Sequence, residues 1–247
     1  MNAPLDVTRR DATLELTLNR PECRNALSQE LITRLTDAFH AAEADVDVRG
    51  VILTGAPPSF CAGLDLREVA AGAATAHDTT PLLALFETID RLPKPVLAAV
   101  NGPAVAGGAG LVSVCDIVVC GETARIGYPG IHHGLVAPVL MPYLLRLVGE
   151  RRARHLLLMG DLLTAPQAVA YGLANEVVSD HELLWRVREL AAALAQHPPQ
   201  AVAETKAALR ALRDWGGADH AARLRELAGS VRLTDEAQRG MRRFLEM

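Results

Sequence analysis

The chain has 247 residues and a formal net charge of −4, and its arginines alternate with acidic residues instead of forming a basic patch, which argues against nucleic-acid binding. Half of its residues are hydrophobic and 4% are aromatic, as in a soluble globular protein whose core is built from Ala, Leu and Val. Its four cysteines show neither C-x-x-C nor zinc-ligand spacing and no apolar run could span a membrane, so we expect a cytoplasmic protein with no metal and no membrane partner.

The first part of the chain alternates strand and helix patterns. Apolar and polar residues alternate from Thr13 to Leu18, which predicts a half-buried strand. After Ser28, a good N-cap, apolar residues recur at helical spacing as far as about residue 44. Short β-branched runs at 51–54 and 95–100 predict two further strands, each closed by a glycine.

Helical patterns follow at 81–91, 107–114, 138–147 and 151–159. Their alternation with strands predicts an α/β layered domain over residues 1–180. Residues 181–247 read as a C-terminal helical region, whose apolar stripe from Leu183 to Leu194 needs a covering surface. Residues 70–80, rich in Ala, Gly and Thr, are predicted to form a mobile loop.

The segment from Gly50 to Glu68 predicts a strand, a proline-rich loop, a turn of small residues and a helix. Asp65 and Glu68 have the spacing of an N-cap and its N3 partner, so helix capping alone already explains Asp65. Backbone N–H groups around Ala62 and Gly63 would then point outward at the positive end of a helix, where an anion can bind.

The segment from Lys94 to Asp116 predicts a second strand, a glycine-rich turn and a second helix. A phosphate-binding P-loop is excluded because Gly108-Ala109 stands where Lys and Ser or Thr are required. A dinucleotide fingerprint is excluded because Ser113 occupies its last glycine position. The two turns together predict an oxyanion hole, in which two N–H groups stabilise negative charge on a carbonyl oxygen.

At this point the motifs resemble those of the enoyl-CoA hydratase/isomerase (crotonase) family in order and spacing. The resemblance is carried by residues 19–28, 59–66, 94–108, 115–117 and 163–178 and runs nearly end to end. It implies an α/β fold built as a spiral of ββα units with a C-terminal helical region that takes part in oligomerisation and completes the CoA site. It also implies homotrimers or homohexamers, an acyl-CoA thioester substrate, and no cofactor besides the CoA of the substrate.

The resemblance assigns site residues to this chain. Ala62 and Gly107 would supply the oxyanion N–H groups, and residues 62–65 (Ala62, Gly63, Leu64 and Asp65) would line the thioester and pantetheine path. Arg24 and Ala26 would lie near the adenine and phosphates of CoA, although Arg24 is equally well explained as a surface arginine.

Both carboxylates that hydratases of the family commonly use are missing. The two positions hold Gly110 and Gly130, and glycine has no side chain that can transfer a proton. Ala137 stands where the naphthoate-synthase branch would carry an aspartate, which argues against that branch. The chain also stops before the basic pair that usually ends the family's C-terminal helix.

His132 is the candidate replacement. In an extended segment residues two apart share a face, so His132 would point where a glutamate at position 130 would have pointed, and could act as a base or orient water. A polar loop histidine is the competing interpretation. Three functions remain open: a hydratase or isomerase with relocated acid/base groups, a hydrolase or decarboxylase that relies on the oxyanion hole with His132 or water, and a non-catalytic acyl-CoA-binding subunit.

Overall fold

The computed structural model describes residues 3–70, 78–136, 138–214 and 234–239. Its main sheet has six strands in the order β1-β2-β3-β4-β6-β9. These strands are β1 (Leu5–Arg10), β2 (Thr13–Leu18), β3 (Gly50–Gly55), β4 (Val96–Val100), β6 (Ile117–Gly121) and β9 (Glu176–Val178). Strands β1 and β2 are antiparallel and every other neighbouring pair is parallel, as the predicted α/β alternation requires.

A smaller sheet holds β5 (Pro103–Val105), β7 (Arg125–Gly127) and β8 (Leu162–Thr164) in that order. The helices are α1 (Gln29–Ala44), α2 (Leu66–Ala70), α3 (Thr80–Arg91), α4 (Gly107–Val114), α5 (Met141–Met159), α6 (Ala165–Tyr171), α7 (Leu183–Ala195) and α8 (Pro199–Ala211). Four short 3₁₀ segments are η1 (Pro21–Cys23), η2 (Pro129–His133), η3 (Pro138–Leu140) and η4 (Leu212–Asp214).

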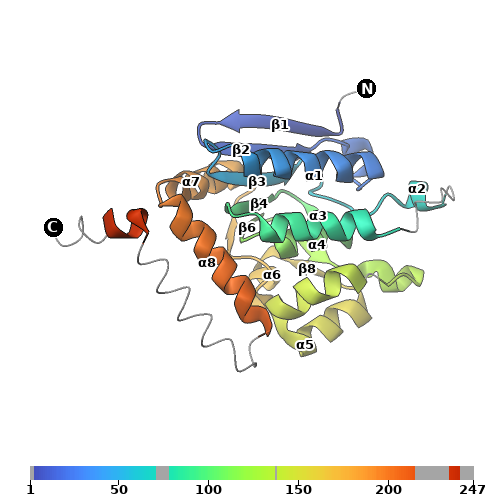
Figure 1. Cartoon of the computed structure of the whole chain (residues 1–247). Coiled ribbons are helices and arrows are strands. Elements are labelled where there is room, and N and C mark those ends of the chain that lie inside the picture. Colours follow the sequence, from blue (N-terminus) through green and yellow to red (C-terminus); the bar gives the residue numbers. More distant parts are fainter. Residues whose placement is uncertain (1–2, 71–77, 137, 215–233, 240–247) are drawn as a thin grey trace.

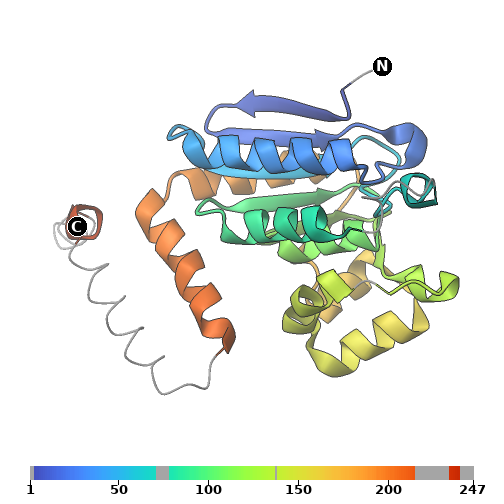
Figure 2. The ribbon, with the colours of Figure 1, turned by 45° about the vertical axis from the view of Figure 1, so that its right-hand side comes forward.

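Helices cover both faces of the main sheet (Figures 1 and 2). Helices α1, α3 and α4 share one large core cluster with residues of β2, β3, β4 and β6. On the other face, α7 packs on Ile52, Leu97, Ala99 and Val119 through Leu183, Val187 and Ala191. The apolar stripe of α7 is therefore covered by the sheet of the same chain, and it gives no support to an oligomer. The predicted domain boundary at residue 180 stays a prediction.

The predicted helices at 138–147 and 151–159 are joined in one element, α5. Gly149, with φ +74°, marks a kink inside α5, which agrees with the break expected between the two patterns. Residues 138–140 form η3 and not the first turn of that helix. No helix in the described part of the chain is long and apolar enough to cross a membrane.

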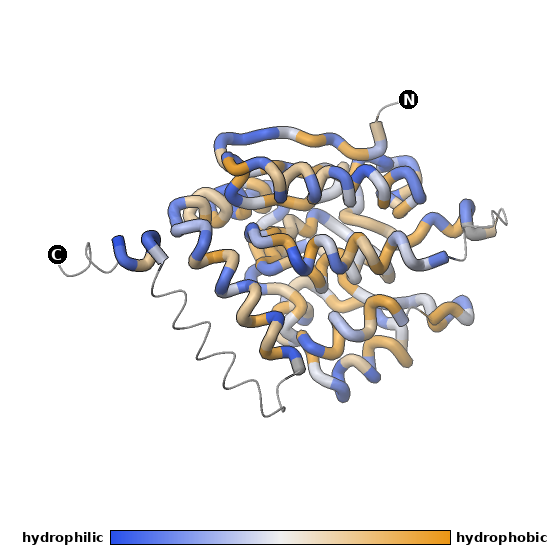
Figure 3. The backbone as a smooth tube through the Cα atoms, viewed as in Figure 1, coloured by the Kyte–Doolittle hydropathy of each residue, from blue (hydrophilic) through white to orange (hydrophobic). Residues whose placement is uncertain are grey.

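Helix α8 has no buried residue, and polar contacts hold it to the body. Lys206 contacts the carboxylate of Asp116, and its Nζ donates to the carbonyl oxygen of Lys94 at 2.9 Å. Hydrophobic and hydrophilic residues alternate along α8 (Figure 3), and Leu209 is 62% exposed. Leu209 is thus an apolar side chain of α8 that the described residues leave largely uncovered.

Candidate functional site

Two turns at the carboxyl ends of β3 and β4 meet side by side. Backbone bonds join the loops that follow the strands: the N–H of Cys61 donates to the carbonyl oxygen of Pro103 at 3.1 Å, and the N–H of Val105 donates to that of Cys61 at 2.8 Å. Carboxyl ends of adjacent parallel strands are where α/β sheets bind ligands. The two glycine-containing segments predicted from sequence are thereby brought to one place.

Glycines allow the close approach of the two turns. A Cβ built on Gly63, whose φ is +87°, would lie 3.0 Å from the backbone nitrogen of Gly107. A Cβ on Gly108 would lie 2.2 Å from the carbonyl oxygen of Cys61, so only glycine fits there. Ala106, directly before α4, has φ +49°, a strained conformation for a residue with a Cβ. The start of α4 is therefore held in place by its surroundings.

The backbone N–H groups of Leu64 and Gly107 have no hydrogen-bond partner among the described residues. Gly107 is the first residue of α4, where the helix itself offers no acceptor. The N–H of Ala62, in contrast, donates to the carbonyl oxygen of Arg24 at 3.0 Å. The prediction of a free donor at Ala62 is therefore wrong for this structure, and Leu64, predicted only as a lining residue, provides the second donor.

The loop predicted to bind CoA packs directly on this turn. The N–H of Leu27 donates to the carbonyl oxygen of Gly63 at 2.7 Å, and the N–H of Asp65 donates to that of Leu27 at 3.0 Å. Arg24 is exposed at the edge of the loop and Ala26 is buried within it. The structure thus gathers the candidate residues Arg24, Ala26, Ala62, Gly63, Leu64, Asp65 and Gly107, while CoA contacts at Arg24 and Ala26 stay a prediction.

Asp65 caps the start of α2 as predicted, since its Oδ1 accepts the N–H of Arg67 at 3.2 Å. The expected return bond from Glu68 is not formed, because Glu68 instead accepts the N–H of Gln29, at the start of α1, at 3.0 Å. Asp65 is also buried against Arg20, whose Nη2 lies 2.9 Å from its Oδ2. Helix capping is therefore only part of the role of Asp65.

Phe86 fills the space where a carboxylate at position 110 would lie. A Cβ built on Gly110 would lie 2.6 Å from Cζ of the fully buried Phe86 ring and 3.5 Å from the Cβ of Leu140. Tyr143 packs edge-on against Phe86, with ring centroids 5.8 Å apart. The three atoms nearest to a Cβ at position 110 all belong to apolar side chains, Phe86 and Leu140.

His132 does not lie as predicted. Residues 129–133 form the 3₁₀ segment η2, in which residues two apart point in different directions, so the shared-face argument fails. The exposed His132 imidazole lies against Gly160, at the end of α5, since a Cβ built there would be 2.6 Å from its Nε2. Gly130 has more room than Gly110, its nearest neighbour being the carbonyl oxygen of Leu135 at 3.2 Å from a built Cβ.

Two other titratable groups near the turns are unsuited to proton transfer or nucleophilic attack. Burial raises the pKa of the Cys61 thiol to about 12, so it stays neutral near pH 7. Burial also raises the pKa of Tyr128 to about 12, and its hydroxyl lies 3.1 Å from Oγ of Ser113, as expected for a packing residue with a bonded hydroxyl. Within the described residues no group of His, Cys, Asp or Glu is placed to hold a metal ion.

A small cavity of about 20 Å³ adjoins the Leu64 donor. It is lined by Leu27, Gln29, Ile32, Leu64, Asp65, Glu68, Asp78 and Leu82. Ligand pockets usually measure about 300–1,000 Å³, so this cavity is too small to hold such a ligand in its present form. Glu68 and Asp78, which sequence reasoning did not select as site residues, are among the residues that line it.

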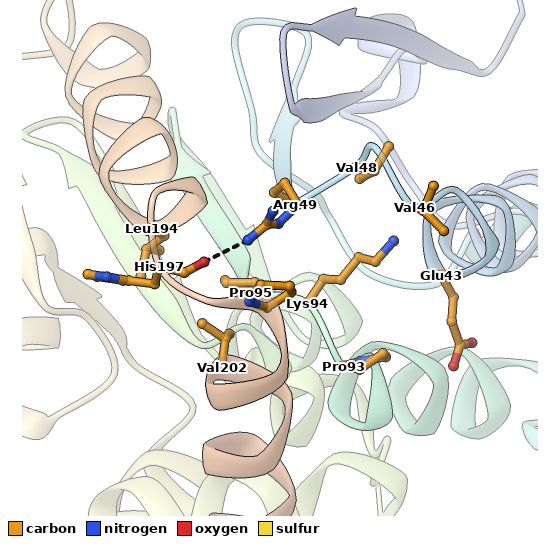
Figure 4. A pocket seen from close by; sticks show the side chains of 11 residues that line it. Glu43, Val46, Val48, Arg49, Pro93, Lys94, Pro95, Leu194, His197 and Val202 are labelled. Carbon is orange, nitrogen blue, oxygen red and sulfur yellow. Dashed lines mark hydrogen bonds between the residues drawn. The ribbon is translucent and has the colours of Figure 1, made fainter. Parts of the chain in front are cut away.

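A cavity of about 270 Å³ lies at the opposite edge of the sheet, at the amino ends of β3 and β4 (Figure 4). Two basic side chains that line it, Arg49 and Lys94, are bound to backbone carbonyl groups. Arg49 donates to the carbonyl oxygen of His197, after α7, at 2.6 Å, and Lys94 donates to the carbonyl oxygen of Asp45, after α1, at 2.6 Å. Such contacts satisfy carbonyl groups at helix ends. This larger cavity is remote from the two free donors, and we assign it no part in the site.

Comparison with known proteins agrees with this geometry. The sequence model of the Enoyl-CoA hydratase/isomerase family matches residues 8–247. A 2,3-dehydroadipyl-CoA hydratase of Escherichia coli is 36% identical over 98% of this chain and 95% of its own, and an enoyl-CoA hydratase of Mycobacterium tuberculosis is 37% identical over 97% and 92%.

The crystal structure of an enoyl-CoA hydratase from Mycobacterium smegmatis superposes with a TM-score of 0.94 at 31% identity, over 99% of this chain and 97% of that one. The expected α/β fold of the crotonase type is thereby confirmed. The chain belongs to the enoyl-CoA hydratase/isomerase (crotonase) family.

Proposed function

We propose that the protein binds an acyl-CoA thioester and stabilises the negative charge that develops on the thioester oxygen through the N–H groups of Leu64 and Gly107. The observation that carries the proposal is that these two donors, on two converging turns, have no partner among the described residues. Donors fixed in advance cost no reorganisation when charge develops, and one such donor is worth about 10²- to 10³-fold in rate. Coenzyme A enters as part of the substrate, in the cytoplasm.

Enoyl-CoA hydratase or isomerase chemistry is the first candidate reaction, and it is supported by the names of the relatives. Proton transfer would then need groups other than residues 110 and 130. Water addition is expected to be slow, because each positioned acid or base contributes about 10²- to 10⁴-fold.

Decarboxylation of a carboxylated acyl-CoA is the second candidate, and the packing of Phe86 against Gly110 favours it. Breaking the bond to CO₂ leaves the electron pair on the thioester enolate, which the two N–H groups would stabilise. Water would then supply the proton to the α-carbon, so the reaction needs no carboxylate in the protein. A substrate carboxylate held against the apolar side chains of Phe86 and Leu140 would be poorly stabilised there, which favours its loss as CO₂. Hydrolysis with water alone and non-catalytic binding are the remaining alternatives, whereas the position of His132 gives no support to its role as base.

Turnover of a panel of esters distinguishes these reactions. We expect crotonyl-CoA to react slowly and malonyl- or methylmalonyl-CoA to be the faster substrates if decarboxylation is the reaction. Measurable binding of every ester without turnover would identify a non-catalytic subunit. Failure to bind any acyl-CoA would contradict the proposal as a whole.

A homotrimer or homohexamer belongs to the same proposal. Its support is the family resemblance. Apolar side chains also remain exposed among the described residues, namely Leu158 and Met159 at the end of α5, Leu162 on β8 and Leu209 on α8, and subunit contacts would cover them. Light scattering at micromolar concentration should give the mass of three or six chains, and the mass of one chain would contradict it.

A further inference from the structure

The N-terminal loop holds the Leu64 donor by hydrogen bonds on both of its sides. Leu27 makes both of these bonds. Its N–H donates to the carbonyl oxygen of Gly63, and its own carbonyl oxygen accepts from the N–H of Asp65. Both peptide groups that flank Leu64 are therefore fixed against one residue of the loop. The direction of the Leu64 N–H depends on how firmly residues 26–27 and 65 are held together.

Arg20 spans these two segments with one guanidinium group. Its Nη1 donates to the carbonyl oxygen of Ala26 at 2.6 Å, and its Nη2 donates to Oδ2 of Asp65 at 2.9 Å. The side chains are 21% and 7% exposed, so solvent weakens this ion pair little. A planar guanidinium can bind two acceptors in fixed directions, which a lysine ammonium on a flexible stem does less well.

The loop that carries Arg20 is itself rigid. The backbone N–H of Arg20 donates to Oδ1 of Asn25 at 2.9 Å, and the amide nitrogen of Asn25 donates to the carbonyl oxygens of Ala56 and Ser59 at 2.8 and 2.7 Å. Asn25 is fully buried and has φ +56°. The guanidinium thus connects a fixed loop to Asp65, the last residue of the turn before α2.

We infer that Arg20 is a positioning residue, which acts through Asp65 and Ala26 to aim the Leu64 N–H at the thioester oxygen. The inference rests on the proposed function, since it needs a substrate carbonyl at the two donors. It assigns to Arg20 an effect on the polarisation of the bound carbonyl that a purely structural ion pair would not have. Small errors in such an alignment are costly in catalysis.

The test measures the carbonyl of a bound ester by difference infrared spectroscopy. The probe is butyryl-CoA with carbon-13 at the thioester carbonyl, a saturated ester that cannot be hydrated. Hydrogen bonds to the oxygen lower the stretching frequency, so the ester bound to the wild-type chain should absorb below its frequency in water. The Arg20→Met variant should lose most of this shift and still bind the ester, and on a substrate that turns over kcat should fall about tenfold or more with little change in KM.

Two further variants keep the test decisive. Arg20→Met leaves a buried carboxylate unpaired and could fail to fold, so Arg20→Met/Asp65→Asn removes both charges while Asn still caps α2. The double variant should lose the shift too. Arg20→Lys keeps the charge without spanning both acceptors and should recover little of the shift, and a lysine variant equal to the wild type would overturn the inference.

Arg188→Met is the matched control. Arg188 binds the buried carboxylate of Glu15 at 2.9 Å, as Arg20 binds Asp65, but it lies on α7 at the other face of the sheet. It should lower stability and leave the carbonyl frequency unchanged.

Gly107→Pro distinguishes a failure of the positioning role of Arg20 from a failure of the proposed function. If this variant loses the shift while Arg20→Met/Asp65→Asn keeps it, the positioning role of Arg20 is wrong and the proposed function stands. If the wild-type complex shows no shift at all, the proposed function itself fails.

Discussion

The two ends of strands β3 and β4 differ in how their backbone groups are paired. At the carboxyl ends, the open edge, the N–H groups of Leu64 and Gly107 have no partner in the described chain. At the amino ends, the satisfied edge, Arg49 and Lys94 bind the carbonyl groups that follow α7 and α1. The first edge also contains the strained Ala106. Unsatisfied backbone groups and backbone strain both lower stability, and in folded proteins they are concentrated at ligand-binding and active sites. The larger cavity lies at the satisfied edge, so cavity size and free backbone donors point to opposite ends of the strands.

The largest effect is expected at the open edge. Gly107→Pro removes one donor, and turnover of any acyl-CoA substrate should fall about 10²- to 10³-fold. Gly107→Ala is the control, because it keeps the N–H and its Cβ would make only ordinary contacts, the nearest at 3.4 Å. Steady-state kinetics on both folded variants checks this, and equal losses in the two would show that shape, not the donor, matters.

Restoring a carboxylate at position 110 is expected to need a second change. Gly110→Glu alone should unfold more easily, by about 1–3 kcal/mol, because its side chain overlaps the Phe86 ring and no rotation of the new side chain moves its Cβ away. Gly110→Glu/Phe86→Ala makes room for the carboxylate, and with Gly130→Glu it should raise hydration of crotonyl-CoA. Urea unfolding and the hydration rate are the two measurements.

Phe86→Ala alone is the control for that series, since it creates the space without the carboxylate. A single Gly110→Glu variant as stable as the wild type would contradict the packing argument. Efficient hydration by the wild-type chain, near the typical enzyme turnover of about 10 s⁻¹, would instead contradict the argument from the missing glutamates.

At the satisfied edge we expect a loss of stability without a loss of binding. Lys94→Met removes the donor to the carbonyl oxygens of Ala42 and Asp45, which should cost about 1–2 kcal/mol of unfolding free energy. Butyryl-CoA affinity should stay at the wild-type value, as judged by calorimetry. A large loss of affinity would mean that the two edges are coupled.

The sequence predicts those features of the fold that depend on residues close together in the chain, such as helix caps. Ser28 caps α1 as its position suggested, its Oγ accepting from the N–H of Leu31 at 3.2 Å. The assignment of Ala62 as a free donor is wrong because its N–H pairs with the carbonyl oxygen of Arg24, which lies far away in the sequence. Glu68 likewise binds a residue far away in the sequence, since it accepts the N–H of Gln29 at the start of α1. The spacing of residues along the chain cannot predict such a contact.

The hydrophobic pattern of the sequence could not predict the short strands or the 3₁₀ segment η2. Strands β5, β7, β8 and β9 have three residues each, too few for alternation to show, and the 3₁₀ geometry of η2 overturned the argument for His132. Ala137, residues 71–77 of the predicted mobile loop and residues 240–247 of the C-terminal segment lie outside the described residues. The predictions made for them therefore stay predictions.

The smallest effect concerns an ion pair far from the donors. Burial alone would raise the pKa of Glu15, but the hydrogen bonds and charges of Arg188 and then Arg10 outweigh it and hold the pKa below its ordinary value of 4.5. A carboxylate with a lowered folded-state pKa stabilises the fold above its unfolded pKa, and this contribution is lost as the pH falls through the folded value. Glu15→Gln should therefore cost on the order of 1 kcal/mol at pH 7, and its deficit relative to the wild type should shrink below about pH 4.5.

Urea unfolding of both chains between pH 7 and pH 3 measures that deficit, and Glu30→Gln, which removes an exposed partner of Arg34, is the control with little expected change at any pH. A deficit that stays constant through the acid range would mean that Glu15 stabilises the fold by packing and not by charge. Because Glu15 faces α7 and not the donor turns, acyl-CoA affinity at pH 7 should be the same in the Glu15→Gln variant and the wild type. A change in affinity would show that the α7 face and the open edge of the sheet are not independent, and the comparison of the two edges would then have to include the helix between them.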